Sequence, residues 1–128
     1  MGLPAAKQGD QIVAMDIHII LQPSFSQPVP TPHPFTGIID GQLSSDVKIM
    51  GFFAAIQGST ASNTPPHIPI GGAFQAPPKN KGQILSGSAT VMINGKPAAR
   101  STDPALTCND PTDLPVGQVV ATATVMIG

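Results

Sequence analysis

Four side chains in the sequence have the chemistry of soft metal ligands: the three His residues and the one Cys. They are His18, His33, His67 and Cys108. Three imidazoles and a thiolate form a nitrogen and sulfur set that suits tetrahedral Zn²⁺. The local spacing contains no C-x-x-C or H-E-x-x-H pattern. The other interpretation therefore stays open, in which each His is an ordinary surface or core residue and the Cys is a small buried apolar side chain.

The elements that must position these residues show an internal repeat. Three segments open with a small-residue turn: PAAKQGD (4–10), FAAIQGS (53–59) and PAARSTD (97–103). Three others begin with Gly-Gln and end in alternating apolar residues, at 41–51, 82–95 and 117–128. The pentapeptide ATVMI at 89–93 recurs unchanged at 123–127. Alternation and β-branched content predict strands in these segments, and loops and turns in the small-residue segments.

The repeat predicts a ring. The last strand has no turn after it and the first turn has no strand before it, so we expect the C-terminal strand to dock beside residues 4–10 and complete a third copy. The fold class follows: all-β, a small cone of short strands with pseudo-three-fold symmetry and long Pro-rich loops, in a single domain over 1–128. Composition agrees, because 13 Gly and 15 Pro with no Glu exclude a helical bundle.

The same repeat brings the four ligand residues into register. Variable loops are expected at about 11–40, 60–81 and 104–116, and they contain all four residues. His18 lies eight residues after Asp10, and His67 lies eight residues after Ser59. Under three-fold symmetry these His residues and Cys108 point to a shared axis, and the longest loop supplies His33 as the fourth ligand. The repeat thus favours a zinc site without excluding ordinary structural roles.

Other patterns exclude several functions. A net charge of −1 without a basic run makes nucleic acid an unexpected partner. One Cys forms no intramolecular disulfide, and we expect no export signal, lipid anchor or membrane span, so synthesis in the cytoplasm is expected. The sequence has no G-x-S-x-G elbow or Gly-rich phosphate loop followed by Lys. We therefore expect no catalytic residues and no enzymatic activity.

The small-residue turns carry further expectations. Asp10 and Asp103 recur at matching positions, where a side-chain cap of the turn is their expected role. Lys7 and Arg100 also correspond and are expected on a solvated rim. The paired alanines of the three turns have two interpretations that stay open: they let a partner's backbone approach closely, or they pack tight internal turns.

The segment around Pro97-Ala98-Ala99-Arg100, preceded by VMINGK, resembles the central signature of the PAAR family, and PAAKQGD at the start is a near copy. The resemblance covers essentially the whole chain. It departs from the family at Ser101-Thr102-Asp103, which stands in place of a Gly-Asp pair, and at Phe53-Ala54-Ala55-Ile56. Proteins of this family are similar to small cones that cap the trimeric spike of contractile injection systems, such as type VI secretion machines and phage-tail-like particles.

The resemblance implies a structural Zn²⁺ near the apex, with His18, His33, His67 and Cys108 as its ligands. It also implies a spike tip that pierces a target membrane, one copy per spike trimer, with effector cargo as a further partner. Such a protein is made without a signal peptide and is delivered or released with the particle. A phage-tail-like particle is our first expectation and a type VI apparatus the second. The rival hypothesis is a small zinc-dependent hydrolase or toxin carried by such a particle.

Overall fold

The computed structural model describes residues 2–24 and 27–128, and these residues form β-structure with no helix. They contain no helix of the length and apolarity needed to cross a membrane. The strands are β1 Leu3–Pro4, β2 Gln11–Leu21, β3 Val29–Gly41, β4 Lys48–Ile49, β5 Phe52–Phe53, β6 Thr60–Asn63, β7 Ala73–Phe74, β8 Lys81–Ile84, β9 Met92–Ile93, β10 Lys96–Pro97, β11 Pro104–Thr107, β12 Leu114–Val120 and β13 Met126–Ile127.

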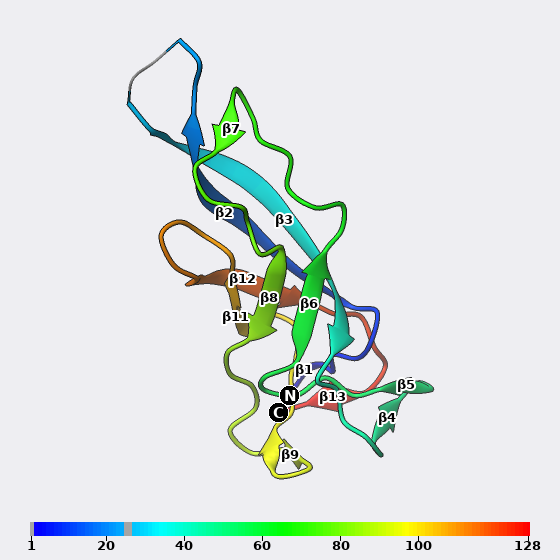
Figure 1. The fold of residues 1–128 in the computed structure, drawn as a ribbon. Helices are drawn as coiled ribbons and strands as arrows, with labels where there is room; N and C mark the ends of the chain where they lie inside the picture. The colour runs from blue at the N-terminus through cyan, green and yellow to red at the C-terminus, as the bar shows by residue number, and fades with distance from the viewer. Residues whose placement is uncertain (1, 25–26) are drawn as a thin grey trace.

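Six of the strands close into an antiparallel barrel. They pair in the order β2, β3, β6, β8, β11 and β12, and β12 pairs back to β2. The barrel consists of three successive strand pairs, β2 with β3, β6 with β8, and β11 with β12. Figure 1 shows these strands in the middle of an elongated molecule, with the β2–β3 hairpin and β7 extending beyond them at one end. The predicted all-β class and three-fold character are confirmed.

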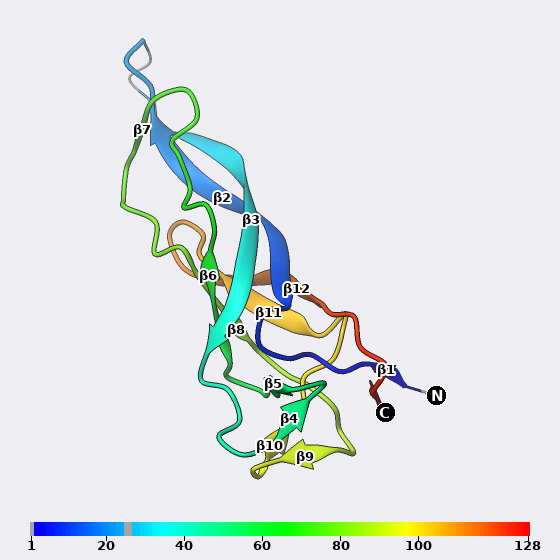
Figure 2. The ribbon, with the colours of Figure 1, turned by 90° about the vertical axis from the view of Figure 1, so that its right-hand side faces the viewer.

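Three small hairpins form the opposite end, which we call the base. Here β4 pairs with β5, β9 with β10, and β13 with β1. Figure 2 shows them together with both chain ends. The pairing of Ile127 with Leu3 repeats that of Ile49 with Phe52 and that of Ile93 with Lys96. The predicted docking of the C-terminal strand beside the N-terminal turn is confirmed.

A ring of backbone hydrogen bonds joins the three units where the barrel meets the base. The amide of Ala6 donates to the carbonyl of Ala99, Ala99 donates to Ala55, and Ala55 donates to Ala6, over 3.0, 3.1 and 3.0 Å. The alanines of all three turns are at most 1% exposed. Such close backbone contacts leave room for no side chain larger than a methyl group, so the alanines pack internal turns. The second interpretation of the Ala pairs is therefore the correct one.

The turns that follow the alanines have the same conformation in all three units. Asp10, Ser59 and Asp103 each accept a hydrogen bond from the amide three residues earlier, over 2.9, 3.0 and 2.7 Å. The cap predicted for Asp10 and Asp103 is confirmed. Thr102 has a φ of 76°, close to the 94° of Gly9 and the 92° of Gly58, so the departure at 101–103 keeps the turn.

The predicted solvated rim is wrong for Lys7. This side chain is only 11% exposed, and its Nζ lies 3.1 Å from Asp10 Oδ1 and 2.9 Å from the carbonyl of Thr122. Arg100 pairs with Asp103 over 2.8 Å and is 22% exposed. Both cations close the turn they belong to, because each lies three residues before the capping carboxylate.

The expected first loop, 11–40, is wrong: it consists mainly of β2 and β3, the two longest strands. Pro30, Pro32 and Pro34 led to the expectation of a loop. They face the odd-numbered residues of β2, whose amides point away from β3: Ile17 and Ile19 donate to Asn109 and Asp110. The register therefore needs no hydrogen bond from the prolines, and the strand tolerates them.

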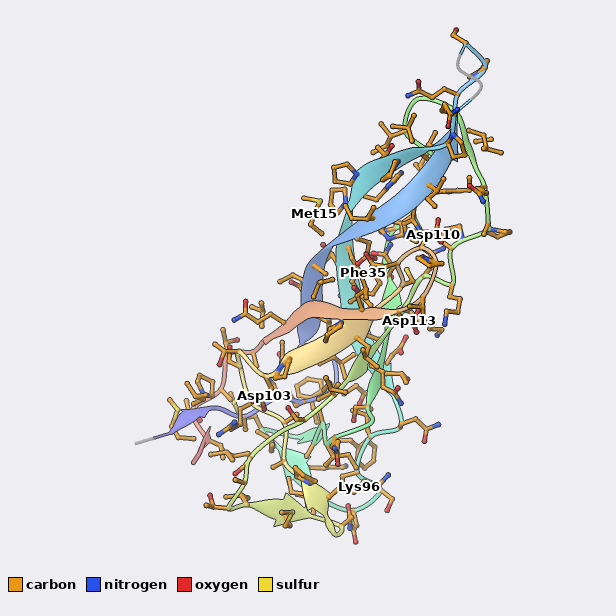
Figure 3. The ribbon with its side chains drawn as sticks, turned by 90° about the vertical axis from the view of Figure 1, so that its left-hand side faces the viewer. Met15, Phe35, Lys96, Asp103, Asp110 and Asp113 are labelled. Atoms are coloured by element: carbon orange, nitrogen blue, oxygen red, sulfur yellow. The ribbon has the colours of Figure 1, made fainter. Side chains whose placement is uncertain are left out.

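Two apolar cores stack along the molecule. The barrel core contains Ile12, Phe35, Ile39, Ile84 and Val119, and the core of the base contains Ile49, Ile93 and Ile127. Figure 3 shows Phe35 among the barrel strands, with Lys96 at the base. The ring of Phe35 takes the space beside Gly37, where a Cβ would lie 2.7 Å from Cε1. A side chain at position 37 would therefore displace the central aromatic of the barrel.

Candidate metal centre

The first two candidate ligands lie on the part of the β2–β3 hairpin beyond the barrel. Even-numbered residues of β2 from Asp16 to Ile20 face inward, and so do odd-numbered residues of β3 from His33 to Ile39. His33 pairs with Asp16, and His18 pairs with Thr31. Both His residues are 1% exposed. Sheet alternation therefore places two imidazoles on one face, two positions apart along the hairpin.

The other two candidates come from segments that follow shorter barrel strands. His67 lies between β6 and β7, and its amide donates to Asn80 Oδ1 over 2.8 Å. Cys108 follows β11 directly, and the next two residues are fixed along β2 because Ile17 donates to Asn109 Oδ1 and Ile19 to Asp110 Oδ2. Backbone-to-side-chain bonds thus hold the segment after β11 against the hairpin and join the segment after β6 to the residue before β8.

The side chains converge. Ligand atoms of Asp16, His18, His67 and Cys108 all lie within 4.8 Å of one another. Cys108 Sγ is 3.7 Å from His18 Nε2, and His67 Nε2 is 2.9 Å from Asp16 Oδ2. His33 adjoins this group, with its ring centroid 5.5 Å from that of His18 and 5.6 Å from that of His67. The structure therefore brings together all four residues singled out from the sequence.

One of the imidazoles, His33, has the hydrogen bonding of a metal-bound histidine. His33 Nδ1 lies 2.8 Å from the carbonyl of Thr31, which accepts its proton. His33 Nε2 is consequently a lone-pair atom, and it is buried without a hydrogen-bond partner. His18 Nδ1 is buried without a hydrogen-bond partner, and the Asp110 Oδ1 atom lies 3.6 Å away from it. Metal-ligating histidines commonly direct the second ring nitrogen to a carbonyl or carboxylate, as His33 does, which leaves the other nitrogen for the metal.

Burial shifts the pKa of two members of the cluster. Loss of solvation raises the pKa of the Cys108 thiol to about 11, and the negative charge of Asp16 adds to the rise. Burial lowers the pKa of His18, and the Asp110 carboxylate partly opposes this shift. The imidazole therefore remains neutral, as a metal ligand must, whereas the thiol needs a nearby cation to ionise near neutral pH.

Asp16 is the member of this cluster that sequence reasoning missed. It is 0% exposed and belongs to no repeat, so the register that identified the His residues could not point to it. The signal that could have found it is the Asp16-Ile17-His18 spacing inside an alternating strand, since residues two apart share a face. The buried group of Asp16, His18, His67 and Cys108 could hold a metal ion, and the unpartnered His33 Nε2 lies beside it.

Comparison with known proteins agrees with the repeat found in the sequence. Residues 74–128 match the family model described as the PAAR motif. The match covers the second and third strand segments and the PAAR turn between them, and it is consistent with a PAAR-family spike-tip protein. A search of the curated proteins finds no match.

Proposed function

We propose that this protein is the tip that caps the trimeric spike of a contractile injection system, because residues 74–128 match the PAAR motif. The motif supports a role related to the spike tip. We further propose that one copy binds each trimer through the base. The opposite end would be stabilised by zinc and would pierce the target membrane, and effector cargo would be a further partner. The whole of 1–128 acts as one domain in this proposal.

The observation that carries the proposal is the three-fold base within a single chain. Three hairpins and the ring of alanine hydrogen bonds repeat one backbone arrangement three times. A spike of three identical subunits ends in a three-fold surface, and one chain with three equivalent hairpins matches all three subunits at once. A monomeric partner has no three-fold surface that the three hairpins could match.

The exposed side chains of the base support docking there. Met92 and Met126 occupy the same position in two units and are 55% and 58% exposed, and Met50 and Phe52 of the remaining unit are 54% and 51% exposed. Clustered apolar side chains of this kind are typical of interaction surfaces, and Met adapts to irregular partner surfaces. These four residues define the docking surface that we propose.

The metal centre supports a structural role at the other end. We propose that His18, His33, His67 and Cys108 hold Zn²⁺, which suits nitrogen and sulfur ligands. The ion would join the β2–β3 hairpin to the segments after β6 and β11. Near the ligand residues, strand pairing does not connect these segments to the hairpin. Because the side chains of these ligands are at most 2% exposed, their burial supports a closed structural site over the alternative of a zinc-dependent hydrolase or toxin.

The setting of this function follows from the same proposal. The chain would be made in the cytoplasm without a signal peptide, assembled on the spike and delivered or released with the particle. A phage-tail-like particle is the first candidate and a type VI apparatus the second.

Placing negative charge on the docking surface is expected to prevent capping without disturbing the metal. We expect the double variant Met92→Asp and Met126→Asp to lose co-purification with a trimeric spike protein that the wild type caps. The wild type should form a one-to-three complex in native mass spectrometry. Two desolvated carboxylates in an apolar contact should weaken binding at least 100-fold, since each costs several kcal/mol.

Met15→Asp is the matched control, because Met15 is equally exposed, at 55%, and lies on β2 away from the base. This variant should bind the trimer as the wild type does, and all variants should keep the same zinc content. Capping by the double variant at wild-type affinity would place the docking surface elsewhere.

A further inference from the structure

We propose that the Asp16 carboxylate is itself a metal ligand of this centre, through Oδ2. This inference rests on the proposed metal site and adds an oxygen donor to its nitrogen and sulfur set.

The two oxygens of Asp16 have different surroundings. Oδ1 accepts hydrogen bonds from the Thr107 hydroxyl and, over 3.4 Å, from Asn109 Nδ2. Oδ2 lies 2.9 Å from His67 Nε2 and 3.4 Å from Cys108 Sγ. Oδ1 is therefore held by hydrogen-bond donors of the protein, whereas Oδ2 lies beside the ligand atoms of His67 and Cys108. A carboxylate that binds a metal through one oxygen, with its second oxygen hydrogen-bonded, has this arrangement.

Charge favours the same conclusion. Asp16 is fully buried, and the ion pairs of Lys and Arg in the described residues involve Asp10, Asp103 and Asp113 instead. A buried carboxylate without a cation carries a large desolvation cost. The Asp16 carboxylate and the Cys108 thiolate together carry two negative charges, which one divalent cation neutralises. The charge of the buried donors thus matches that of Zn²⁺.

An outer role for Asp16 would make it the partner of His67 Nε2, 2.9 Å from Oδ2, but the same oxygen also lies 3.4 Å from the Cys108 sulfur. A carboxylate outside the coordination shell accepts the proton of the ring nitrogen that does not bind the metal. For His33 that position is taken by the carbonyl of Thr31, and the carboxylate that faces His18 Nδ1 is Asp110, at 3.6 Å. Asp16 instead faces His67 Nε2 and the Cys108 sulfur, among the atoms that must meet at the ion. Its oxygen therefore lies where a ligand would, with the carboxylate as a coordinating donor.

The test is a titration of the metal-free full chain with Co²⁺, which reports thiolate coordination as a charge-transfer band and ligand geometry as visible bands. Asp16→Asn removes the charge and keeps the shape. Asp110→Asn is the matched control, because it makes the same exchange at the carboxylate beyond His18. We expect Asp110→Asn to weaken Co²⁺ binding by about tenfold, as outer partners do. Asp16→Asn should weaken it by about 100-fold or more and change the visible bands.

A second variant covers the case in which Asp16→Asn does not fold. Asp16→Cys replaces one ligand by another, so coordination should persist and the thiolate charge-transfer band should gain intensity from a second sulfur. Unchanged intensity in Asp16→Cys, or a loss in Asp16→Asn no larger than that in Asp110→Asn, overturns the role of Asp16 alone. A wild-type protein that shows no thiolate band with Co²⁺ overturns the proposed metal site, and the role of Asp16 with it.

Discussion

Replacing Cys108 with Ser is expected to release the metal and lower the melting temperature of the zinc-loaded protein by about 10 °C or more. The hydroxyl does not ionise near neutral pH, so the site loses its soft anionic ligand. Zinc present at about 1,000 times its Kd contributes about 4 kcal/mol to the folded state. At roughly 3 °C per kcal/mol for a chain of this size, that contribution corresponds to the expected shift.

Circular dichroism is the suitable measurement, because the chain has no Trp or Tyr to report unfolding by fluorescence. Metal content is measured in parallel. The control is wild-type protein treated with a chelator, whose melting temperature should fall to nearly that of Cys108→Ser. The barrel core contains many apolar residues besides Cys108, Ile12 and Phe35 among them, so a cooperative transition should remain in both samples. Identical melting of the wild type with and without chelator would contradict a stabilising metal.

The repeat in the sequence predicted those parts of the fold in which the local sequence pattern and the tertiary contacts favour the same structure. The ATVMI copies and the PAAR-like turns predicted strands in the base and the closing of the ring, because each copy must form the same contacts. The substituted turn at 101–103 was identified as a copy of the others, and in the structure the φ of Thr102 is close to those of Gly9 and Gly58. Repetition thus compensated for strands of only two residues, which are too short to recognise by alternation.

The long hairpin was missed because its prolines were weighed singly. Their period of two, at positions 30, 32 and 34, is the period of a strand, and their lack of an amide proton matters only where a partner strand needs one. Missing the hairpin also hid Asp16, since a residue in an expected loop has no defined face. The His and Cys residues were found because their scarcity and register do not depend on secondary structure.

The closed ring leads to the second large effect. Deleting residues 123–128 removes β13, its pairing with Leu3 and Pro4, and the hydrogen bond from the amide of Ala5 to the carbonyl of Val125. It also removes Ile127 from the core of the base, where this side chain is 6% exposed. We expect the deletion to abolish the cooperative thermal transition, because the ring of alanines loses one of its three supports and β1 loses the strand with which it pairs.

Single substitutions test the same point without shortening the chain. Ile49, Ile93 and Ile127 occupy equivalent positions and are 6%, 9% and 6% exposed, so each change to Ala should destabilise the protein by a similar amount, about 2–4 kcal/mol. Met126→Ala is the control: its side chain is 58% exposed, and its loss should cost less than about 0.5 kcal/mol. If Ile127→Ala cost as little stability as Met126→Ala while Ile49→Ala and Ile93→Ala were strongly destabilising, the third unit would contribute less to stability than the other two. The C-terminal strand would then be an accessory to the fold and not the element that closes it.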